Sequence, residues 1–351
     1  MANLRAIRTR IKSVENTRQI TKSMKMVAAS KLRKTQAAFA SLRAYADRSG
    51  DILKSVGGEL AAKDYAGGQS GGAPAGASRE APGAAASGAE IWMVPREEVR
   101  TVCYVLIVGN RGLCGTYNQA LLRYCEKLIK SSDKQNYVIS CGRWGKDLIA
   151  GAGVQVQETF EIGDTPTHQE ALELAERLKT LYREGTVDEI VLLYQHYRTV
   201  LSQEPTQVTL LPIRQDQEIS PFNSPLNIPG AESASKKQPA RSRGRGDAGG
   251  KADGGSPKTE VRDILFEPDR ESVLTALLDM YIGNTVHAVL LEARCGEHSA
   301  RMTAMTAAAD NTEELISDLT LEMNHARQAA ITTEISEIAS GAEALKKTSS
   351  D

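Results

Sequence analysis

The chain has 351 residues, of which 41% are hydrophobic and 5% aromatic, and its formal net charge is −1. This length allows two domains, and the hydrophobic content is ordinary for a water-soluble protein. The longest apolar run, residues 102–108, is far shorter than the roughly 20 residues that span a bilayer, so the sequence predicts no transmembrane helix. Five scattered cysteines form no CxxC pair and no histidine cluster accompanies them, so we expect neither a disulfide framework nor a metal site.

Charge is divided unevenly between the two ends of the chain. Residues 1–56 contain thirteen Lys or Arg against three acidic residues, a difference of +10. Residues 310–351 contain nine acidic and three basic residues, a difference of −6. A basic helix also suits the phosphates of nucleic acids, so a coiled-coil protein that binds nucleic acid or acts as a scaffold stays open as an alternative function.

Both ends of the chain also have the apolar spacing of long helices. In residues 3–56 the stripe consists of Leu4, Ile7, Ile11, Val14, Thr21, Met24, Ala28, Phe39 and Leu42. In residues 271–345 it consists of Ile316, Leu319, Met323, Ala326, Ile331, Ile335, Ile338, Ala342 and Leu345. Narrow stripes at intervals of three and four are typical of a coiled-coil seam, so we predict that the two terminal helices pair antiparallel. A continuous last helix from residue 269 to 345 would be on the order of 115 Å long.

The middle of the chain alternates short apolar runs with amphipathic segments. The pattern predicts strands at residues 101–108, 136–140, 154–160, 187–197 and 200–211 and helices at 119–130, 144–150 and 168–183. This order indicates an open, mostly parallel sheet flanked by helices. The predicted fold class is therefore mixed: a long antiparallel coiled coil of the terminal helices carries a Rossmann-like α/β domain.

Two segments of low complexity separate these parts. Residues 57–90 contain 23 Gly, Ala or Ser among 34 positions, too little apolar surface to fix one shape. We divide the chain into an N-terminal helix (1–56), a flexible Gly/Ala-rich insertion (57–95), a Rossmann-like domain (96–218), a flexible basic insertion (219–262) and a C-terminal helix (263–351).

One glycine-rich loop, residues 109–115, could carry chemistry. Its GxxGxxG spacing after a strand is close to the dinucleotide fingerprint but lacks the GxG opening, and the sequence has no Walker pattern. We favour a surface turn that serves a partner, with a nucleotide-dependent enzyme as a further alternative. Cys114 has no histidine paired with it by any sequence pattern, so we interpret it as a packed small residue, not a nucleophile.

Several long motifs in order identify a family. They are IRTRIKSVENTRQITKSMKMVAASKLRK from Ile7, NRGLCG from Asn110, LFEPD from Leu265, and ARMTAMTAAADNTEELI and NHARQAAITTEISEIASGA toward the C-terminus. With them the chain resembles the γ subunit of F-type ATP synthases of bacterial type, over its whole length apart from the two insertions. The resemblance implies a central rotor shaft that couples ion flow through a membrane rotor to conformational cycling of catalytic β subunits. It implies no catalysis and no cofactor on this chain.

The resemblance also implies partners and contact residues. The partners are the α and β subunits of the catalytic head, the ε subunit and the ring of c subunits, with no nucleic acid. The contacts with β subunits fall on Met24, Lys25, Arg111, Cys114, Arg327, Gln328 and Thr332. The contacts with the c ring and the ε subunit fall on Ile264, Phe266 and Glu267. The expected location is peripheral, on the cytoplasmic face of the bacterial cell membrane, with indirect membrane association.

Overall fold

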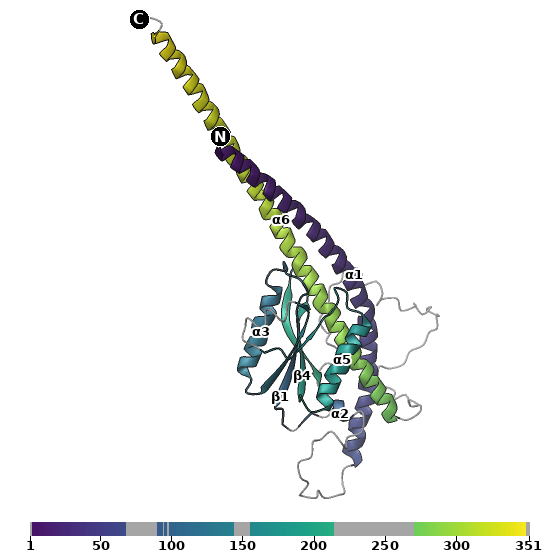
Figure 1. Cartoon of the computed structure of the whole chain (residues 1–351). Coiled ribbons are helices and arrows are strands. Elements are labelled where there is room, and N and C mark those ends of the chain that lie inside the picture. Colours follow the sequence, from purple (N-terminus) through teal and green to yellow (C-terminus); the bar gives the residue numbers. More distant parts are fainter. Residues whose placement is uncertain are drawn as a thin grey trace, which may run out of the picture.

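The computed structural model describes residues 2–67, 90–93, 95–96, 98–143, 155–213 and 270–348. It consists of a two-helix shaft and a foot built around a β-sheet (Figure 1). The shaft contains α1 (Ala2–Gly67) and α6 (Arg270–Thr348), which run antiparallel along each other. The predicted pairing of the terminal helices is confirmed.

The seam between α1 and α6 is apolar, as the spacing predicts. On α1 the buried members are Ile7, Thr21, Ala28, Leu32, Thr35 and Phe39, and on α6 they include Met305 and Leu319. Leu32 and Phe39 pack against Ala288, Leu291 and Cys295 of α6 and against Tyr197 of the foot. Since a buried Leu or Phe contributes roughly 1.5–3 kcal/mol, these contacts, and not exposed charges, hold the two helices together.

The foot is a five-stranded sheet with helices on both faces. Its elements are α2 (Glu90–Met93), β1 (Thr101–Ile107), α3 (Tyr117–Ser131), β2 (Gln135–Cys141), β3 (Glu158–Phe160), α5 (His168–Arg183), β4 (Glu189–Tyr197) and β5 (Gln203–Leu211). The strand order is β3-β2-β1-β4-β5, and all pairs are parallel except β4 with β5. The mostly parallel sheet of the prediction is confirmed, and its last two strands form an antiparallel hairpin.

Local sequence explains where α5 begins. Thr167 caps its N-terminus, accepting a hydrogen bond from the backbone N–H of Glu170, while the Glu170 carboxylate accepts one from the backbone N–H of Thr167. This reciprocal pair satisfies two amide groups that the first helical turn leaves unbonded. Glu170 also accepts from the backbone N–H of Gly163, so the helix start and the loop after β3 are fixed together.

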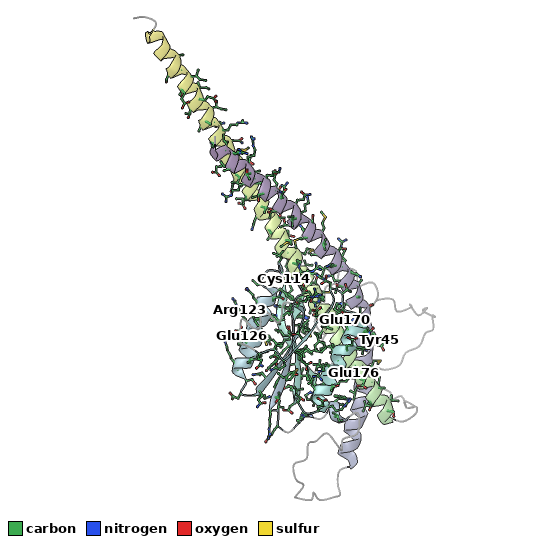
Figure 2. All side chains as sticks on the ribbon, viewed as in Figure 1. Tyr45, Cys114, Arg123, Glu126, Glu170 and Glu176 are labelled. Carbon is green, nitrogen blue, oxygen red and sulfur yellow. The ribbon has the colours of Figure 1, made fainter. Side chains whose placement is uncertain are left out.

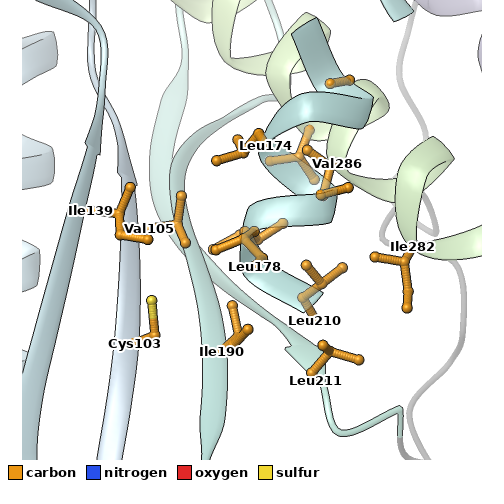
Figure 3. Close-up of a cluster of buried hydrophobic side chains, with 14 of the residues drawn as sticks. Cys103, Val105, Ile139, Leu174, Leu178, Ile190, Leu210, Leu211, Ile282 and Val286 are labelled. Carbon is orange, nitrogen blue, oxygen red and sulfur yellow. The ribbon is translucent and has the colours of Figure 1, made fainter. Parts of the chain in front are cut away.

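α6 is a shaft helix and a core helix at once. One core cluster fills the space between the sheet, α5 and α6, with Ile282 and Val286 of α6 facing Leu174 and Leu178 of α5 (Figure 3). A second cluster lies on the other face, between the sheet and α3. α6 contains a stretch that is long enough and apolar enough to cross a membrane. However, 56% of that stretch is buried inside the protein, which is typical of a core helix.

The structure differs from several predicted boundaries: β3 begins at Glu158, not at residue 154, β5 begins at Gln203, not at residue 200, and two differences concern the first insertion. α1 continues to Gly67, eleven residues beyond the predicted end at 56, because residues 59–63 (ELAAK) are good helix formers in spite of the surrounding glycines. Trp92, inside the predicted insertion 57–95, is 2% exposed and packs 6.1 Å from the ring of Tyr182. The predicted helix 144–150 and the insertion 219–262 lie outside the described residues.

Two glycines in α6 permit close packing without interrupting the helix. A Cβ on Gly296 would lie 3.1 Å from the Tyr117 ring and 3.3 Å from the carbonyl oxygen of Gln195. A Cβ on Gly283 would lie 2.9 Å from one methyl group of Leu172, which is 38% exposed and can move aside. Gly296 is therefore needed for the approach of α6 to the sheet, whereas Gly283 is not.

We predict opposite effects for alanine at these two positions. Gly296→Ala should lower the free energy of unfolding by about 1 kcal/mol, because overpacking against Tyr117 and backbone (about 1–3 kcal/mol) exceeds the gain in helix propensity (about 1 kcal/mol). Gly283→Ala should leave stability unchanged or raise it. Urea unfolding followed by circular dichroism measures both, and equal destabilisation by the two variants would contradict the packing argument.

Candidate functional site

Three charged side chains of α6 lie buried where this helix crosses the end of β1. Arg294 and Glu297 are each 1% exposed and Arg301 is 8% exposed. Glu297 receives one arginine on each carboxylate oxygen, with Nη1 of Arg294 and Nη2 of Arg301 both at 2.6 Å. The residues are three and four apart, so they share one face of the helix. We call these three residues the buried triad.

The two arginines of the triad join α6 to the loops of the foot. Arg294 donates to the carbonyl oxygens of Val108 (3.1 Å) and Ile162 (3.2 Å). Arg301 donates to the carbonyl oxygens of Arg111 (3.0 Å) and Gly112 (3.3 Å). α6 is thereby bonded to the loop that follows β1 and to the loop that follows β3.

The electrostatics of the triad favour charged side chains in spite of burial. Burial alone would raise the pKa of Glu297, but the positive charges of Arg294 and Arg301 outweigh it, and the pKa is lowered. Burial lowers the pKa of the neighbouring His298. The His298 ring lies 3.1 Å from the carbonyl oxygen of Asp164 and 3.4 Å from Nη1 of Arg301. Both partners are satisfied by the neutral ring that donates from Nε2 and accepts at Nδ1.

α1 is fastened to the foot by its own polar contacts. Lys31 lies 2.5 Å from the carboxylate of Asp164, and Gln36 donates to the Tyr197 hydroxyl at 2.9 Å. Burial acts to raise the pKa of Asp164, but the hydrogen bond and charge of Lys31 prevail and lower it to about 2. Both shaft helices are therefore bonded to loops at one edge of the sheet.

A second buried acid connects α6 with the end of β4. Glu292 is fully buried, pairs with the His196 ring and accepts from the backbone N–H of Tyr197 at 3.2 Å. The hydrogen bond with Glu292 is the main reason why the pKa of His196 is raised. The contact adds a third attachment between α6 and the carboxyl ends of the strands.

These contacts occupy the place where Rossmann-like domains bind ligands. In open α/β sheets that place is the crevice outside the carboxyl ends of the strands where their order reverses, here between β1 and β4. A Cβ on Gly109 would lie 3.0 Å from the Glu297 carboxyl group, and the Tyr117 hydroxyl donates to the carbonyl oxygen of Ala293 at 2.7 Å. α6 thus fills the crevice, and the glycine at 109 serves the approach of Glu297. In the part of the chain that the structure describes, no group of three His, Cys, Asp or Glu could hold a metal ion.

The glycine-rich loop is a surface turn, but only some of its side chains face outward. Arg111 is exposed, 3.8 Å from Asp164, whereas Cys114 is 4% exposed and burial raises the pKa of its thiol. Figure 2 shows Cys114 at the end of the foot from which the shaft emerges. The apolar side chain that the loop displays is Leu113, 60% exposed with a φ of 62°. Within this loop the exposed side chains include Arg111 and Leu113, whereas the Cys114 side chain is packed inside the foot.

The predicted contact residues on the shaft do not converge on one site. Met24 and Lys25 are half-buried on α1, while Arg327, Gln328 and Thr332 are exposed on α6. They belong to the two shaft helices, whereas Arg111 belongs to the loop after β1. Ile264, Phe266 and Glu267 fall outside the described residues.

The C-terminal part of α6 projects beyond α1, and the seam prediction is wrong there. Arg18 lies 3.7 Å from Glu313, so at equal rise the start of an antiparallel α1 falls at about residue 329 of α6. Beyond it, Ile331, Ile335 and Ile338 are 48%, 62% and 66% exposed. Figure 1 shows this end of α6 as a single helix. We call residues 330–342 the free tip.

Comparisons with known proteins agree with this architecture. A model of the ATP synthase family matches residues 3–345. The ATP synthase gamma chains of Desulfitobacterium hafniense and Moorella thermoacetica are 35% and 36% identical over 347 residues, which cover 99% of this chain and 100% of each relative. The chain belongs to the ATP synthase gamma chain family. It is thus the central stalk, a rotor part and a non-catalytic subunit, of an ATP synthase.

Solved structures show the same fold at lower identity. A chain of the Euglena gracilis mitochondrial ATP synthase, in a structure of its OSCP, F1 and c-ring, aligns with a TM-score of 0.58 and 17% identity, covering 98% of this chain and 95% of that one. A chain of the Tetrahymena thermophila enzyme, in a structure of its central stalk and c-ring, aligns with a TM-score of 0.52 and 20% identity, covering 82% and 99%. The fold of this chain is thus shared with chains of these two solved structures.

The buried triad of this gamma chain was missed by sequence reasoning. Charged residues are almost never fully buried unless they are paired, so Arg294, Glu297 and Arg301 read as solvent-facing. One signal was present: their spacing of three and four continues the buried stripe of α6 that includes Leu290. Charges at positions of an apolar stripe indicate an internal ion pair.

We predict that Glu297→Gln destabilises the protein strongly. The change leaves two buried guanidinium groups without a countercharge, which typically costs about 3–5 kcal/mol. The matched control is Glu313→Gln, whose partner Arg18 is 43% exposed and whose loss should cost at most about 1 kcal/mol. Urea unfolding at pH 7 compares the two, and similar effects would contradict the role of the triad.

We predict that the effect of Asp164→Asn depends on pH. The folded-state pKa of Asp164 is lowered, so its contribution is complete above the unfolded value near 3.9 and is lost as pH falls toward about 2. At pH 7 the variant should be less stable by about 1 kcal/mol, after allowance for solvent screening of this partly exposed pair. Urea unfolding at pH 7, 5, 4 and 3 should show a constant difference down to pH 5 that shrinks below pH 4. A difference that grows with acidity would overturn the assignment.

Proposed function

We propose that this chain is the shaft that couples ion flow through a membrane rotor to conformational cycling of the catalytic β subunits. The foot is turned by the rotor, and the shaft transmits the rotation to the head. A partner shifts a conformational equilibrium only through differential contact energy, so the changing face of the shaft biases each β subunit in turn between its states. The chain performs no chemistry of its own and binds no cofactor.

The free tip is the observation that carries the proposal. A single helix with three exposed isoleucines on intervals of four and three is not a stable end for an isolated protein in water. The N-terminus of α1 lies level with about residue 329 of α6, so the apolar stripe of the free tip has no partner within the described part of the chain. The subunits that surround the shaft supply that partner.

The surface charge of the shaft supports an asymmetric interaction with these surrounding subunits. The outward side of α1 is basic, with exposed Arg5, Arg8, Arg10, Lys12, Lys22, Arg33 and Lys34. The exposed acidic side chains of α6, apart from Glu313, which pairs with Arg18, are Asp310, Glu314, Asp318, Glu322, Glu334 and Glu337. Since the two helices face each other across the seam, their outward sides are opposite. Each surrounding subunit therefore meets a different charge as the shaft turns.

The partners of this chain are proposed from the family. Solved chains that share its fold lie in a structure of a central stalk with its c-ring and in a structure of OSCP, F1 and c-ring. We assign contacts with β subunits to Met24, Lys25, Arg327, Gln328 and Thr332 and to the loop of Arg111 and Cys114, with Leu113 as its exposed side chain. We assign contacts with the c ring and the ε subunit to Ile264, Phe266 and Glu267. The complex lies on the cytoplasmic face of the bacterial membrane, and this chain reaches the membrane only through its partners.

Reconstitution with α and β subunits tests the function. The mixture should form one complex and show ATPase activity that depends on this chain. Retention on a DNA column that falls with salt, without complex formation, would favour the nucleic-acid-binding alternative. Nucleotide hydrolysis by the isolated chain would favour an enzyme.

We predict that tip and shaft variants lose coupling without loss of fold. Ile335→Asp, Arg327→Ala and Gln328→Ala replace exposed side chains, so the unfolding temperature of the isolated chain should stay within about 2 °C. ATP-driven ion pumping by the reconstituted holoenzyme should fall severalfold per ATP hydrolysed. Lys127→Ala, exposed on α3 at the side of the foot, is the control and should pump normally. Normal pumping by all three variants would contradict these contacts.

A further inference from the structure

The loop between β3 and α5, residues 161–167, is bonded to both helices of the shaft. Lys31 of α1 pairs with the carboxylate of Asp164, and Arg294 of α6 donates to the carbonyl oxygen of Ile162 at 3.2 Å. We call this segment the β3–α5 loop. It is the place where α1, α6 and the foot meet, so its position determines how the shaft is seated on the foot.

Two histidines of α6 bind the backbone of the β3–α5 loop. The Nε2 atom of His298 lies 3.1 Å from the carbonyl oxygen of Asp164, and the Nε2 atom of His287 lies 3.3 Å from the carbonyl oxygen of Pro166. A carbonyl oxygen only accepts, so each ring donates from Nε2. The two histidines are eleven residues apart, about three helical turns, and therefore project from one face of α6. α6 thus holds the loop at two points.

Both rings are bound in the neutral form. In a neutral ring that donates from Nε2, the Nδ1 atom is an acceptor. The Nδ1 atom of His298 lies 3.4 Å from Nη1 of Arg301 and accepts from it. The Nδ1 atom of His287 is buried and has no hydrogen-bond partner among the described residues. Burial lowers the pKa of both histidines, so both rings are neutral at pH 7.

A proton added to His298 replaces its contact with Arg301 by repulsion. The protonated ring has two donors and no acceptor, so its Nδ1–H faces a guanidinium group. Glu297 holds that guanidinium group in place at 2.6 Å. The carboxylates of Glu297 and Asp164 attract the new charge, but Asp164 is already paired with Lys31 of α1. Burial and the charge of Arg301 prevail, and the pKa of His298 is lowered.

A proton added to His287 has no acceptor to bind. Its Nδ1 atom is buried, and the centre of the His168 ring, on α5, lies 5.4 Å from the centre of its own ring. Glu170 of α5 attracts the charge, but its carboxylate oxygens already accept from the backbone N–H groups of Gly163 and Thr167. Burial is the main reason why the pKa of His287 is lowered, and His168 lowers it further. The charged ring is stable only if it moves into water.

The acidic groups around the β3–α5 loop do not titrate in the same range of pH. The pKa of Asp164 is lowered to about 2, and those of Glu170 and Glu297 are also lowered, because hydrogen bonds and positive charges outweigh burial. These carboxylates stay charged between pH 7.5 and 5.5. A change in the loop over that range therefore belongs to the histidines.

We propose that His287 and His298 form a pH-sensitive latch that holds the β3–α5 loop on α6 at neutral pH and releases it when the rings are protonated. Release also loosens the attachment of α1, because Asp164 lies on the same loop. The apolar core between the sheet, α5 and α6 contains no histidine, so the joint loosens without unfolding of the foot. The latch is a property of the chain itself, and only its consequence for rotation rests on the proposed function.

Hydrogen exchange of the isolated full chain tests the latch. Mass spectrometry follows peptides that cover residues 161–167 at pH 7.5 and pH 5.5, after correction for the intrinsic effect of pH on exchange. In the released loop the histidines have the ordinary pKa near 6.5, so protons favour release below that value. Over these two pH units the protection of the loop should fall by up to about tenfold for each histidine.

Glutamine separates titration from hydrogen bonding. His287→Gln and His298→Gln keep a side-chain N–H for the carbonyl oxygens and an oxygen that can accept, but they cannot be protonated. The double variant should protect the loop equally at pH 7.5 and pH 5.5. His325→Gln, which removes an exposed histidine of the same helix, is the matched control and should keep the pH dependence of the unchanged chain.

The outcomes decide the latch separately from the proposed function. Protection that does not change with pH in the unchanged chain would overturn the latch, and so would an equal loss of protection in the double variant. Histidine NMR of the unchanged chain is a second measure: the midpoints of His287 and His298 should lie below pH 6.5, and midpoints at or above this value would also overturn it. None of these measurements involves α or β subunits, so a failed latch leaves the proposed function standing.

Discussion

The structure depends on one constraint: α6 is both the longest helix of the shaft and a core helix of the foot. Its segment 282–299 is almost entirely buried between the sheet, α5 and α1, and the same helix continues as the free tip. No linker or domain boundary lies between the two parts. When the foot rotates, the helix that reaches the tip therefore rotates with it. No separate element is needed to couple the foot to the shaft.

The buried triad is suited to this constraint because its bonds are directional. Apolar contacts hold α6 against the sheet but are non-directional and allow a helix to turn about its axis at small cost. Hydrogen bonds from Arg294 and Arg301 to fixed carbonyl oxygens specify one rotational setting of α6. The desolvation of three charges is offset by these bonds and by the two short contacts with Glu297. Close approach at Gly296 adds to the same setting.

Sequence periodicity was sufficient to predict the sheet and the pairing of the shaft helices. It was insufficient to predict the buried triad that joins α6 to the foot, or the free tip. A short β-branched apolar run followed by glycine, such as residues 101–107, favours a buried strand, and the terminal stripes require partner helices, so both followed from local pattern. The stripe continues unchanged through Ile331, Ile335 and Ile338, and periodicity cannot show where an antiparallel partner ends. Gly109 read as a turn or a phosphate-binding residue, and only the fold brings Glu297 beside it. Exposed leucines such as Leu201 have no local signal, because exposure is a property of the assembled chain.

Charge on the shaft has a different role from the one its sequence distribution suggests. Opposite net charges at the two ends favour an antiparallel pair, yet Arg18 with Glu313 is the one ion pair between α1 and α6 among the described residues, and it is exposed. Exposed pairs contribute about 1 kcal/mol at most, so the seam depends on apolar packing. The remaining charges face outward, basic on one side and acidic on the other. In the proposed function, a cylinder of uniform charge would interact equally with all surrounding subunits, whereas a two-sided shaft places each subunit in a different field at every angle. In the proposed function, the charge separation that contributes little to folding is thus what lets surrounding subunits respond to the angle of the shaft.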